Sequence, residues 1–226
     1  MNVVTNLSQL RKAYGLSQQD IADAISVKRT TVVAIEQGKR DLTSQELISL
    51  ADKLGVDLQD LLTQEMPDIG KYREMLIEAV RVSTLDGQPL PKTKLAKLLY
   101  LADFAWFYDH LEPMSGMKYR RLEYGPVPDQ YFRIVDELFL EGKISIDALS
   151  GGAQLISLSR TGNMSRPQHL RSAELALIRD VADKWRESNV EEIVDFTHTQ
   201  LPWQICRPNE FIPYELITQE EKANVY

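Results

Sequence analysis

The apolar residues in the first sixty positions are spaced as in a series of short helices. Leu7, Leu10 and Tyr14 recur at three- and four-residue intervals, which is the period of one buried helical face. Similar apolar stripes follow, separated by glycines and by residues that cap helices. The pattern predicts five helices, at about residues 7–14, 18–25, 29–37, 44–54 and 57–62.

Capping residues indicate where two of these helices begin. Ser17 is followed three residues later by Asp20, and Thr43 by Glu46, which is the spacing of a capping box. Gly38 stands where the third helix should end, because glycine readily adopts the left-handed conformation found after helices. We therefore expect a short turn between the second and third helices and a defined end to the third.

Two short helices joined by a tight turn form the helix-turn-helix arrangement. In that geometry the second helix of the pair lies in the major groove and its first side chains meet the base edges. Here that helix begins near Arg29, and Lys28, Arg29, Lys39 and Arg40 lie in a 13-residue window whose only acidic residue is Glu36. A local basic face of this kind can bind double-stranded DNA even on an acidic protein.

The stretch from Leu16 to Arg40, LSQQDIADAISVKRTTVVAIEQGKR, resembles the lambda-repressor-like (Xre) family, and the resemblance extends over about residues 4–62. It implies that bases are read by Lys28, Arg29, Thr30 and Ala34, and that phosphates are bound by Gln18, Lys39 and Arg40. Arg29 would contact guanine through two hydrogen bonds. Arg11 and Glu36 match a salt bridge that joins the first and third helices in relatives. In the alternative interpretation, the fold serves dimerisation or docking instead of DNA binding.

The apolar periodicity lapses at about residues 63–68, where Pro67 cannot continue a helix. We therefore expect a DNA-binding domain at 1–66, a linker at 67–71 and a second domain at 72–226. Further helices are predicted from Lys71 to about Val80, at 94–108, at 130–141, at about 172–188 and at 190–199. The 94–108 segment is apolar on almost every face and should be the central buried helix of the second domain.

Between those helices the pattern changes. Residues 118–124 are expected to be extended, and residues 125–128, Gly-Pro-Val-Pro, to turn the chain into the next helix. Apolar residues at 144–146 and 155–158 flank a glycine pair, which predicts a two-stranded hairpin. The proline-containing tail after residue 200 is expected to be irregular. The fold class is therefore mainly α: a five-helix lambda-repressor-like helix-turn-helix domain and a larger helical domain with a small β-hairpin.

The order of three sequence motifs in the second domain is typical of one protein family. The motifs are Lys97-Leu-Leu-Tyr-Leu-Ala-Asp103, then Tyr124-Gly-Pro-Val-Pro128, then His198 with Trp203. Over about residues 71–215 the chain resembles the Panacea, or SocA-like, antitoxin domain. The resemblance implies a domain that neutralises a toxin protein encoded by an adjacent gene, usually by direct binding. At least one relative instead acts as an adaptor that delivers its toxin to a protease.

Composition narrows the class of protein. Hydrophobic residues make up 43% and charged residues 26% of the 226, with a formal net charge of −7, which is ordinary for a globular protein. No apolar run reaches the roughly 20 residues of a membrane span. The single cysteine, Cys206, excludes an internal disulfide and suits the cytoplasm. We expect a cytoplasmic protein with no membrane partner.

No pattern of catalytic or metal-binding residues stands out. His110, His169 and His198 are far apart in the sequence, and Cys206 follows His198 by eight residues without a third orienting group. A buried, hydrogen-bonded His198 is the simpler interpretation. We therefore expect no enzymatic activity, no metal and no cofactor.

Candidate toxin-binding residues border the Gly-Pro element, because aromatic and arginine side chains dominate interface energetics. They are Arg120, Arg121 and Tyr124, together with Tyr108 from the aromatic central helix. The expected function is an antitoxin that neutralises its toxin and, as a homodimer on a palindrome, represses its own operon. A prophage or mobile-element transcriptional regulator and a protease adaptor are the alternatives.

Overall fold

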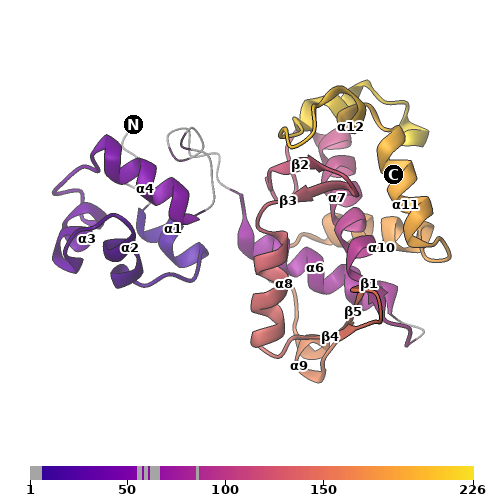
Figure 1. Cartoon of the computed structure of the whole chain (residues 1–226), viewed down its shortest axis with the longest axis horizontal. Coiled ribbons are helices and arrows are strands. Elements are labelled where there is room, and N and C mark those ends of the chain that lie inside the picture. The colour runs from indigo at the N-terminus through magenta and orange to yellow at the C-terminus, as the bar shows by residue number, and fades with distance from the viewer. Residues whose placement is uncertain (1–6, 55–57, 59–60, 62–66, 85–86) are drawn as a thin grey trace. The chain divides into compact units, whose positions relative to one another are not determined.

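A computed structural model describes residues 7–54, 58, 61, 67–84 and 87–226 of the chain (Figure 1). It divides into two compact units, Met1–Ile69 and Gly70–Tyr226. Each unit has its own buried apolar core, and the two are described separately below. Both are built mainly of helices, so the expected fold class is confirmed.

The first unit is a bundle of short helices. They are α1 (Leu7–Ala13), α2 (Gln18–Ala24), α3 (Arg29–Glu36) and α4 (Ser44–Leu54). Ile21, Val32, Ile35 and Leu50 are completely buried and form the centre of the bundle. Most of the fifth predicted helix lies outside the described residues, but Leu58 and Leu61 are helical and Leu61 is buried.

Both predicted capping boxes form. Ser17 Oγ accepts the Asp20 N–H at 3.1 Å, and Asp20 Oδ2 accepts the Ser17 N–H at 2.6 Å. The Thr43 N–H donates to Glu46 Oε2 at 2.8 Å, and the Glu46 N–H donates to Thr43 Oγ1 at 3.3 Å. These bonds satisfy backbone N–H groups that have no partner inside a helix. The starts of α2 and α4 were therefore predictable from these four side chains.

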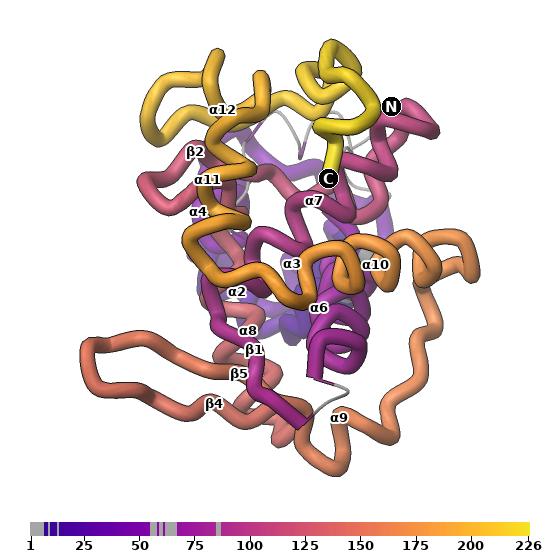
Figure 2. Tube along the Cα trace, turned by 90° about the vertical axis from the view of Figure 1, so that its right-hand side faces the viewer, coloured from indigo at the N-terminus to yellow at the C-terminus, as the bar shows by residue number. Residues whose placement is uncertain are grey.

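The second unit is arranged around one long helix, α7 (Lys92–His110). Every residue of α7 from Lys94 to Phe107 is buried, as the sequence predicts for a central helix. Around it the chain forms α6 (Ile69–Ser83), α8 (Tyr131–Leu140), α9 (Arg160–Met164), α10 (Ser172–Lys184), α11 (Val190–Thr199) and α12 (Leu201–Ile205). Both α10 and α11 pack against α7 (Figure 2). The short helix α9 had no counterpart among the predicted elements.

Two small antiparallel sheets complete the second unit. The predicted hairpin is present as β4 (Ile144–Ala148) and β5 (Gln154–Leu158), and a two-residue strand, β1 (Leu90–Pro91), pairs with β5. The other sheet pairs β2 (Tyr119–Leu122) with β3 (Gly125–Pro128). The prediction that residues 125–128 form a turn was wrong. The turn lies at residues 123–124, and Gly125, with a φ of +87°, begins the returning strand.

The C-terminal segment is more ordered than predicted. It forms α12 and the 3₁₀ segments η2 (Tyr214–Gln219) and η3 (Lys222–Asn224). Pro202 lies in the first turn of α12, where a missing N–H costs nothing. The Ile212 N–H donates to the Tyr119 carbonyl at 2.8 Å. The segment thus extends the β2–β3 sheet and packs against α7.

Candidate functional site

The helix α3 presents the predicted base-reading residues. Lys28 caps its N-terminus with an extended backbone, and Lys28, Arg29 and Thr30 are exposed. Ala34, one turn further on, is half-buried. Val32 and Ile35, on the opposite face, are completely buried. The core therefore fixes α3 with its first turn facing solvent, which is the geometry needed to meet base edges.

A chain of hydrogen bonds holds Arg29 in place. Its Nε and Nη2 donate to Gln18 Oε1 at 3.3 and 3.1 Å, and Gln18 Nε2 donates to Glu36 Oε2 at 2.8 Å. Glu36 also accepts Arg11 Nε at 2.7 Å, so the predicted Arg11–Glu36 salt bridge is confirmed. Burial alone would raise the pKa of Glu36, but hydrogen bonds from Arg11 and Gln18 outweigh it and lower that pKa.

The predicted phosphate-binding residues have different surroundings. Lys39 is exposed after the end of α3, whereas Gln18 is engaged with Arg29 and Glu36. Arg40 donates through Nη2 to Glu46 Oε1 at 2.8 Å. The same carboxylate caps α4, so Arg40 also stabilises that helix start. The sequence indicated the capping role of Glu46 but not its partner.

In the second unit, the sequence motifs on α7, on β3 and at the end of α11 lie next to one another. Lys97 of α7 is completely buried, and its Nζ donates to the Pro126 carbonyl of β3 at 2.9 Å. A Cβ atom at Gly125 would lie 2.7 Å from Thr197 Oγ1 of α11 and 2.9 Å from Lys97 Cε. Only glycine therefore lets the hairpin approach α7 and α11 so closely. Burial lowers the pKa of Lys97 to about 7.

His198 and Trp203 lie face to face, with ring centroids 4.0 Å apart. Nε2 of His198 is buried and has no hydrogen-bond partner among the described residues, so the expected hydrogen-bonded histidine is wrong at this atom. Burial lowers the pKa of His198, and the charge of Lys97 adds to the effect.

Cys206 is hydrogen-bonded to the backbone and not to His198. Its Sγ lies 3.7 Å from the Phe211 carbonyl oxygen. Burial raises the pKa of its thiol, which opposes thiolate chemistry.

Two of the predicted toxin-binding residues are held within the chain. Arg120 pairs with Asp129 at 2.7 Å and lies 3.9 Å from the Phe211 ring centroid. Arg121 donates from Nε to the Trp203 carbonyl at 2.8 Å, and its guanidinium lies 3.8 Å from the Trp203 ring. The contacts with Phe211 and Trp203 join the β2–β3 hairpin to the C-terminal segment.

The other two candidates lie in different places. Tyr124 is 66% exposed at the tip of the hairpin, whereas Tyr108 is half-buried near the C-terminal end of α7. The structure therefore places three of the four candidates on one hairpin. Only Tyr124 is a largely exposed aromatic side chain there, and its role in binding a partner stays a prediction.

Comparison with known proteins assigns both units to families. Residues 7–61 match the family model for helix-turn-helix domains, and residues 95–204 match the model described as antitoxin SocA-like, Panacea domain. The chain is a helix-turn-helix protein with a Panacea domain. It is also 34% identical over 59 residues to an uncharacterized HTH-type transcriptional regulator of Methanocaldococcus jannaschii. That match covers 26% of this chain and 89% of the relative. No solved structure matches the chain.

These matches confirm both resemblances that the sequence carries. Together the two domains make the chain a DNA-binding regulator of the toxin–antitoxin type. None of the described helices combines the length and the apolar content of a membrane span.

The Panacea domain also contains a buried carboxylate, Asp103, for which the sequence predicted no contacts. Asp103 of α7 accepts the Ser115 N–H at 2.9 Å and the hydroxyls of Tyr119 and Tyr214 at 3.2 and 2.9 Å, as well as the Ser115 hydroxyl. Burial raises the pKa of Asp103, and these four hydrogen bonds oppose that rise. The cluster joins α7, β2 and η2 at one point. Its signal was an acidic residue between the apolar residues Ala102 and Phe104 in the middle of α7.

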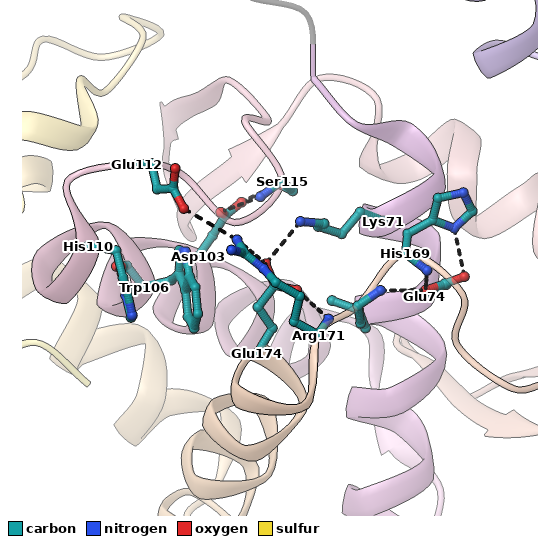
Figure 3. A network of polar contacts seen from close by, with 11 residues as sticks. Lys71, Glu74, Asp103, Trp106, His110, Glu112, Ser115, His169, Arg171 and Glu174 are labelled. Atoms are coloured by element: carbon teal, nitrogen blue, oxygen red, sulfur yellow. Dashed lines mark hydrogen bonds and ion pairs between the residues drawn. The ribbon is translucent and has the colours of Figure 1, made fainter.

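A second polar network ties α6 to α10 (Figure 3). The completely buried Glu174 accepts Lys71 Nζ at 2.9 Å and Arg171 Nη2 at 3.0 Å. Glu74 accepts the backbone N–H groups of residues 168–170, and its Oε1 lies 2.8 Å from His169 Nδ1.

The third histidine, His110, stacks on Trp106, with ring centroids 3.7 Å apart. The three histidines thus lie in separate contacts, and the described residues contain no cluster of three potential metal ligands.

Proposed function

We propose that this protein is an antitoxin. Its Panacea domain binds and silences a toxin protein encoded by the adjacent gene, and its helix-turn-helix domain binds the promoter of the same operon and represses it. The observation that carries the proposal is that one chain combines a Panacea domain with a helix-turn-helix domain whose third helix begins with the exposed cations Lys28 and Arg29. The protein would work in the cytoplasm by binding alone, with no cofactor and no catalytic step.

The surroundings of α3 support the DNA-binding half of the proposal. Its first turn is exposed, and Arg29 is held by Gln18 at the start of α2. Helix-turn-helix dimers read two half-sites about one helical turn apart on the duplex. We therefore propose a homodimer bound to a palindromic operator, with bases read by Lys28, Arg29, Thr30 and Ala34.

The surroundings of the buried ionisable side chains in the Panacea domain support the toxin-binding half of the proposal. Lys97, Asp103 and Glu174 are completely buried in contacts that join elements of the fold. Groups used in this way hold the domain together and are poorly placed to meet a substrate. Neutralisation would then follow from the surface of the domain, through steric or conformational inhibition of the toxin.

Co-expression tests the toxin-binding half directly. The adjacent gene is induced alone and together with this chain, and colony-forming units are counted. We expect toxicity alone and at least partial rescue by the full chain. A harmless gene product, or toxicity that persists beside this protein, would contradict the proposal. Repeating the rescue in a protease-deficient host separates direct neutralisation, which persists there, from a protease adaptor, which requires degradation.

A further inference from the structure

The Panacea domain contains a pocket of about 260 Å³. It lies between the start of α7, the β2–β3 hairpin, the start of α8 and the β4–β5 turn. The pocket is smaller than the roughly 300–1,000 Å³ that drug-sized ligands occupy. Its size therefore suits one large side chain of a partner better than a whole cofactor.

Two exposed aromatic side chains stand at this pocket. Tyr124, from the hairpin tip, is 66% exposed, and Phe132, from the first turn of α8, is 51% exposed. An aromatic ring left in water beside a pocket is typical of a protein–protein interface, because partner contact removes its apolar surface from water.

The charge of the lining indicates the chemistry of the occupant. Lys92 and Lys97 are the basic residues that line the pocket, and no described acidic residue does so. Lys97 is completely buried and bonded to the Pro126 carbonyl, so the half-buried Lys92 is the cation that a partner can reach. Among the described residues, neither lysine lies within ion-pair distance of a carboxylate. Lys92 Nζ instead donates to Gln154 Oε1 at 2.9 Å and lies 5.4 Å from the Phe132 ring. An accessible lysine at a pocket whose lining contains no described acidic residue is complementary to a carboxylate.

We propose that this pocket is the docking site for the toxin, and that it takes one large apolar side chain next to an acidic residue. The apolar side chain would enter between Tyr124 and Phe132, and the neighbouring carboxylate would pair with Lys92 at the pocket mouth. The inference rests on the proposed antitoxin function and names the surface that carries it. It adds Phe132 and Lys92 to Tyr124, the exposed candidate from the sequence.

Paired substitutions in the full chain test the apolar contact. Phe132→Ala removes the ring at the pocket, whereas Phe139→Ala removes a ring of similar exposure, 48%, on the same helix but outside the lining. Affinity for the purified product of the adjacent gene is measured by calorimetric titration. We expect Phe132→Ala to weaken binding about tenfold or more, and Phe139→Ala to leave it within about twofold.

A second pair of substitutions tests the contact between Lys92 and the partner's carboxylate. Lys92→Glu reverses a charge at the pocket, in the first turn of α7, where helices tolerate acidic residues. Lys222→Glu reverses an exposed charge in η3, away from the lining. We expect about a tenfold or greater loss for Lys92→Glu alone. Thermal unfolding of all four variants confirms that each is folded.

Blocked dipeptides provide a test that does not depend on the toxin. Acetyl-Phe-Asp-amide, acetyl-Phe-Asn-amide and 3-phenylpropionate are titrated into the isotopically labelled full chain, and the amide signals of Gly125, Gly152 and Ala153 are followed. We expect the acidic dipeptide to shift these three signals at several-fold lower concentration than its neutral analogue. We also expect that preference to disappear in Lys92→Glu.

The outcomes separate the two proposals. If toxin binding is normal in Phe132→Ala and Lys92→Glu, the docking site is wrong and the antitoxin function stands. If the adjacent gene product does not bind at all but the acidic dipeptide is preferred, the antitoxin function is wrong and the acidic-segment site stands. Tighter binding of 3-phenylpropionate than of either dipeptide would make the pocket a small-molecule site and overturn the inference. Absence of any shift at these signals would also overturn it.

Discussion

Arg29 and Lys97 are two cations that the sequence marks for function, and they lie in opposite surroundings. Arg29 is exposed and held by Gln18, so its charge is available to a nucleic acid. Lys97 is completely buried, which lowers its pKa to about 7, and it donates to the Pro126 carbonyl inside the fold. The position of Arg29 was predictable because it follows from helical spacing. The contact of Lys97 was not, because it joins segments 29 residues apart.

Replacing Arg29 with alanine should remove the main base contact of the reading helix. We expect a loss of about 1–3 kcal/mol in operator binding, the value of one bidentate base contact. Fluorescence anisotropy with the protein's own promoter DNA measures it. Lys53→Ala, an exposed basic residue on α4, is the control. Operator affinity within about 1 kcal/mol of wild type in Arg29→Ala would show that another residue reads the site.

Lys97 should make the stability of the Panacea domain depend on pH. Its pKa is lowered from 10.5 to about 7 by burial. Between these values the unfolded chain binds a proton that the folded chain does not, so stability rises with pH. The rise is at most about 1.4 kcal/mol per pH unit, and below pH 7 the contribution is constant.

Urea unfolding of wild type and Lys97→Met at pH 6, 7, 8 and 9 measures this contribution. The difference between the two proteins cancels groups that titrate in both. We expect the stability of wild type relative to Lys97→Met to be level from pH 6 to 7 and to increase above it. A difference that stays level up to pH 9 would mean that Lys97 keeps its charge in the folded protein.

Among the elements, the β2–β3 hairpin is where the local sequence led to a wrong prediction, a turn at residues 125–128 in place of a strand. Two prolines within four residues favour a turn, because proline cannot donate to a sheet. Among the described residues, however, the strand β3 pairs with β2 on one side only, and a residue without an N–H can face its other side. Pro126 and Pro128 therefore fit in β3 opposite Arg121 and Tyr119. The two-residue strand β1 was equally unpredictable, since it is too short to show a period. Helices with several turns were predicted well.

Gly125 should be far less tolerant of alanine than Gly152, although both have a φ of +87°. A Cβ at Gly152 meets no atom within 4 Å, so alanine there costs only the strain of the left-handed backbone, about 1–2 kcal/mol. At Gly125 the Cβ also crowds Thr197 and Lys97, which adds about 1–3 kcal/mol. Chemical unfolding of both variants compares these costs. Equal losses would show that the hairpin moves away without penalty.

At the scale of the whole molecule, each unit has a core of its own. Leu50 is completely buried in the first unit and Leu99 in the second. The sequence predicted two domains because the helical period lapses around Pro67, a local signal. The pocket at Phe132 was not predictable, because its walls come from four elements that meet only in the folded chain.

Separate cores should give two thermal transitions in calorimetry. Leu50→Ala and Leu99→Ala each leave a cavity and cost about 2–5 kcal/mol in their own unit. We expect Leu50→Ala to lower only one transition and Leu99→Ala only the other. A single transition that both substitutions lower would instead show that the units unfold together.

The C-terminal segment gives the two halves different timing during synthesis. Asp103 receives its hydrogen bond from Tyr214, and β2 receives Ile212, so the Panacea domain completes its folding only when these late residues have left the ribosome. Contacts in the first unit span at most a few tens of residues. At about 5–20 residues per second, the remaining 157 residues take roughly 8–30 s to make. Under the proposed function, each new molecule would therefore gain its DNA-binding domain before its toxin-binding domain.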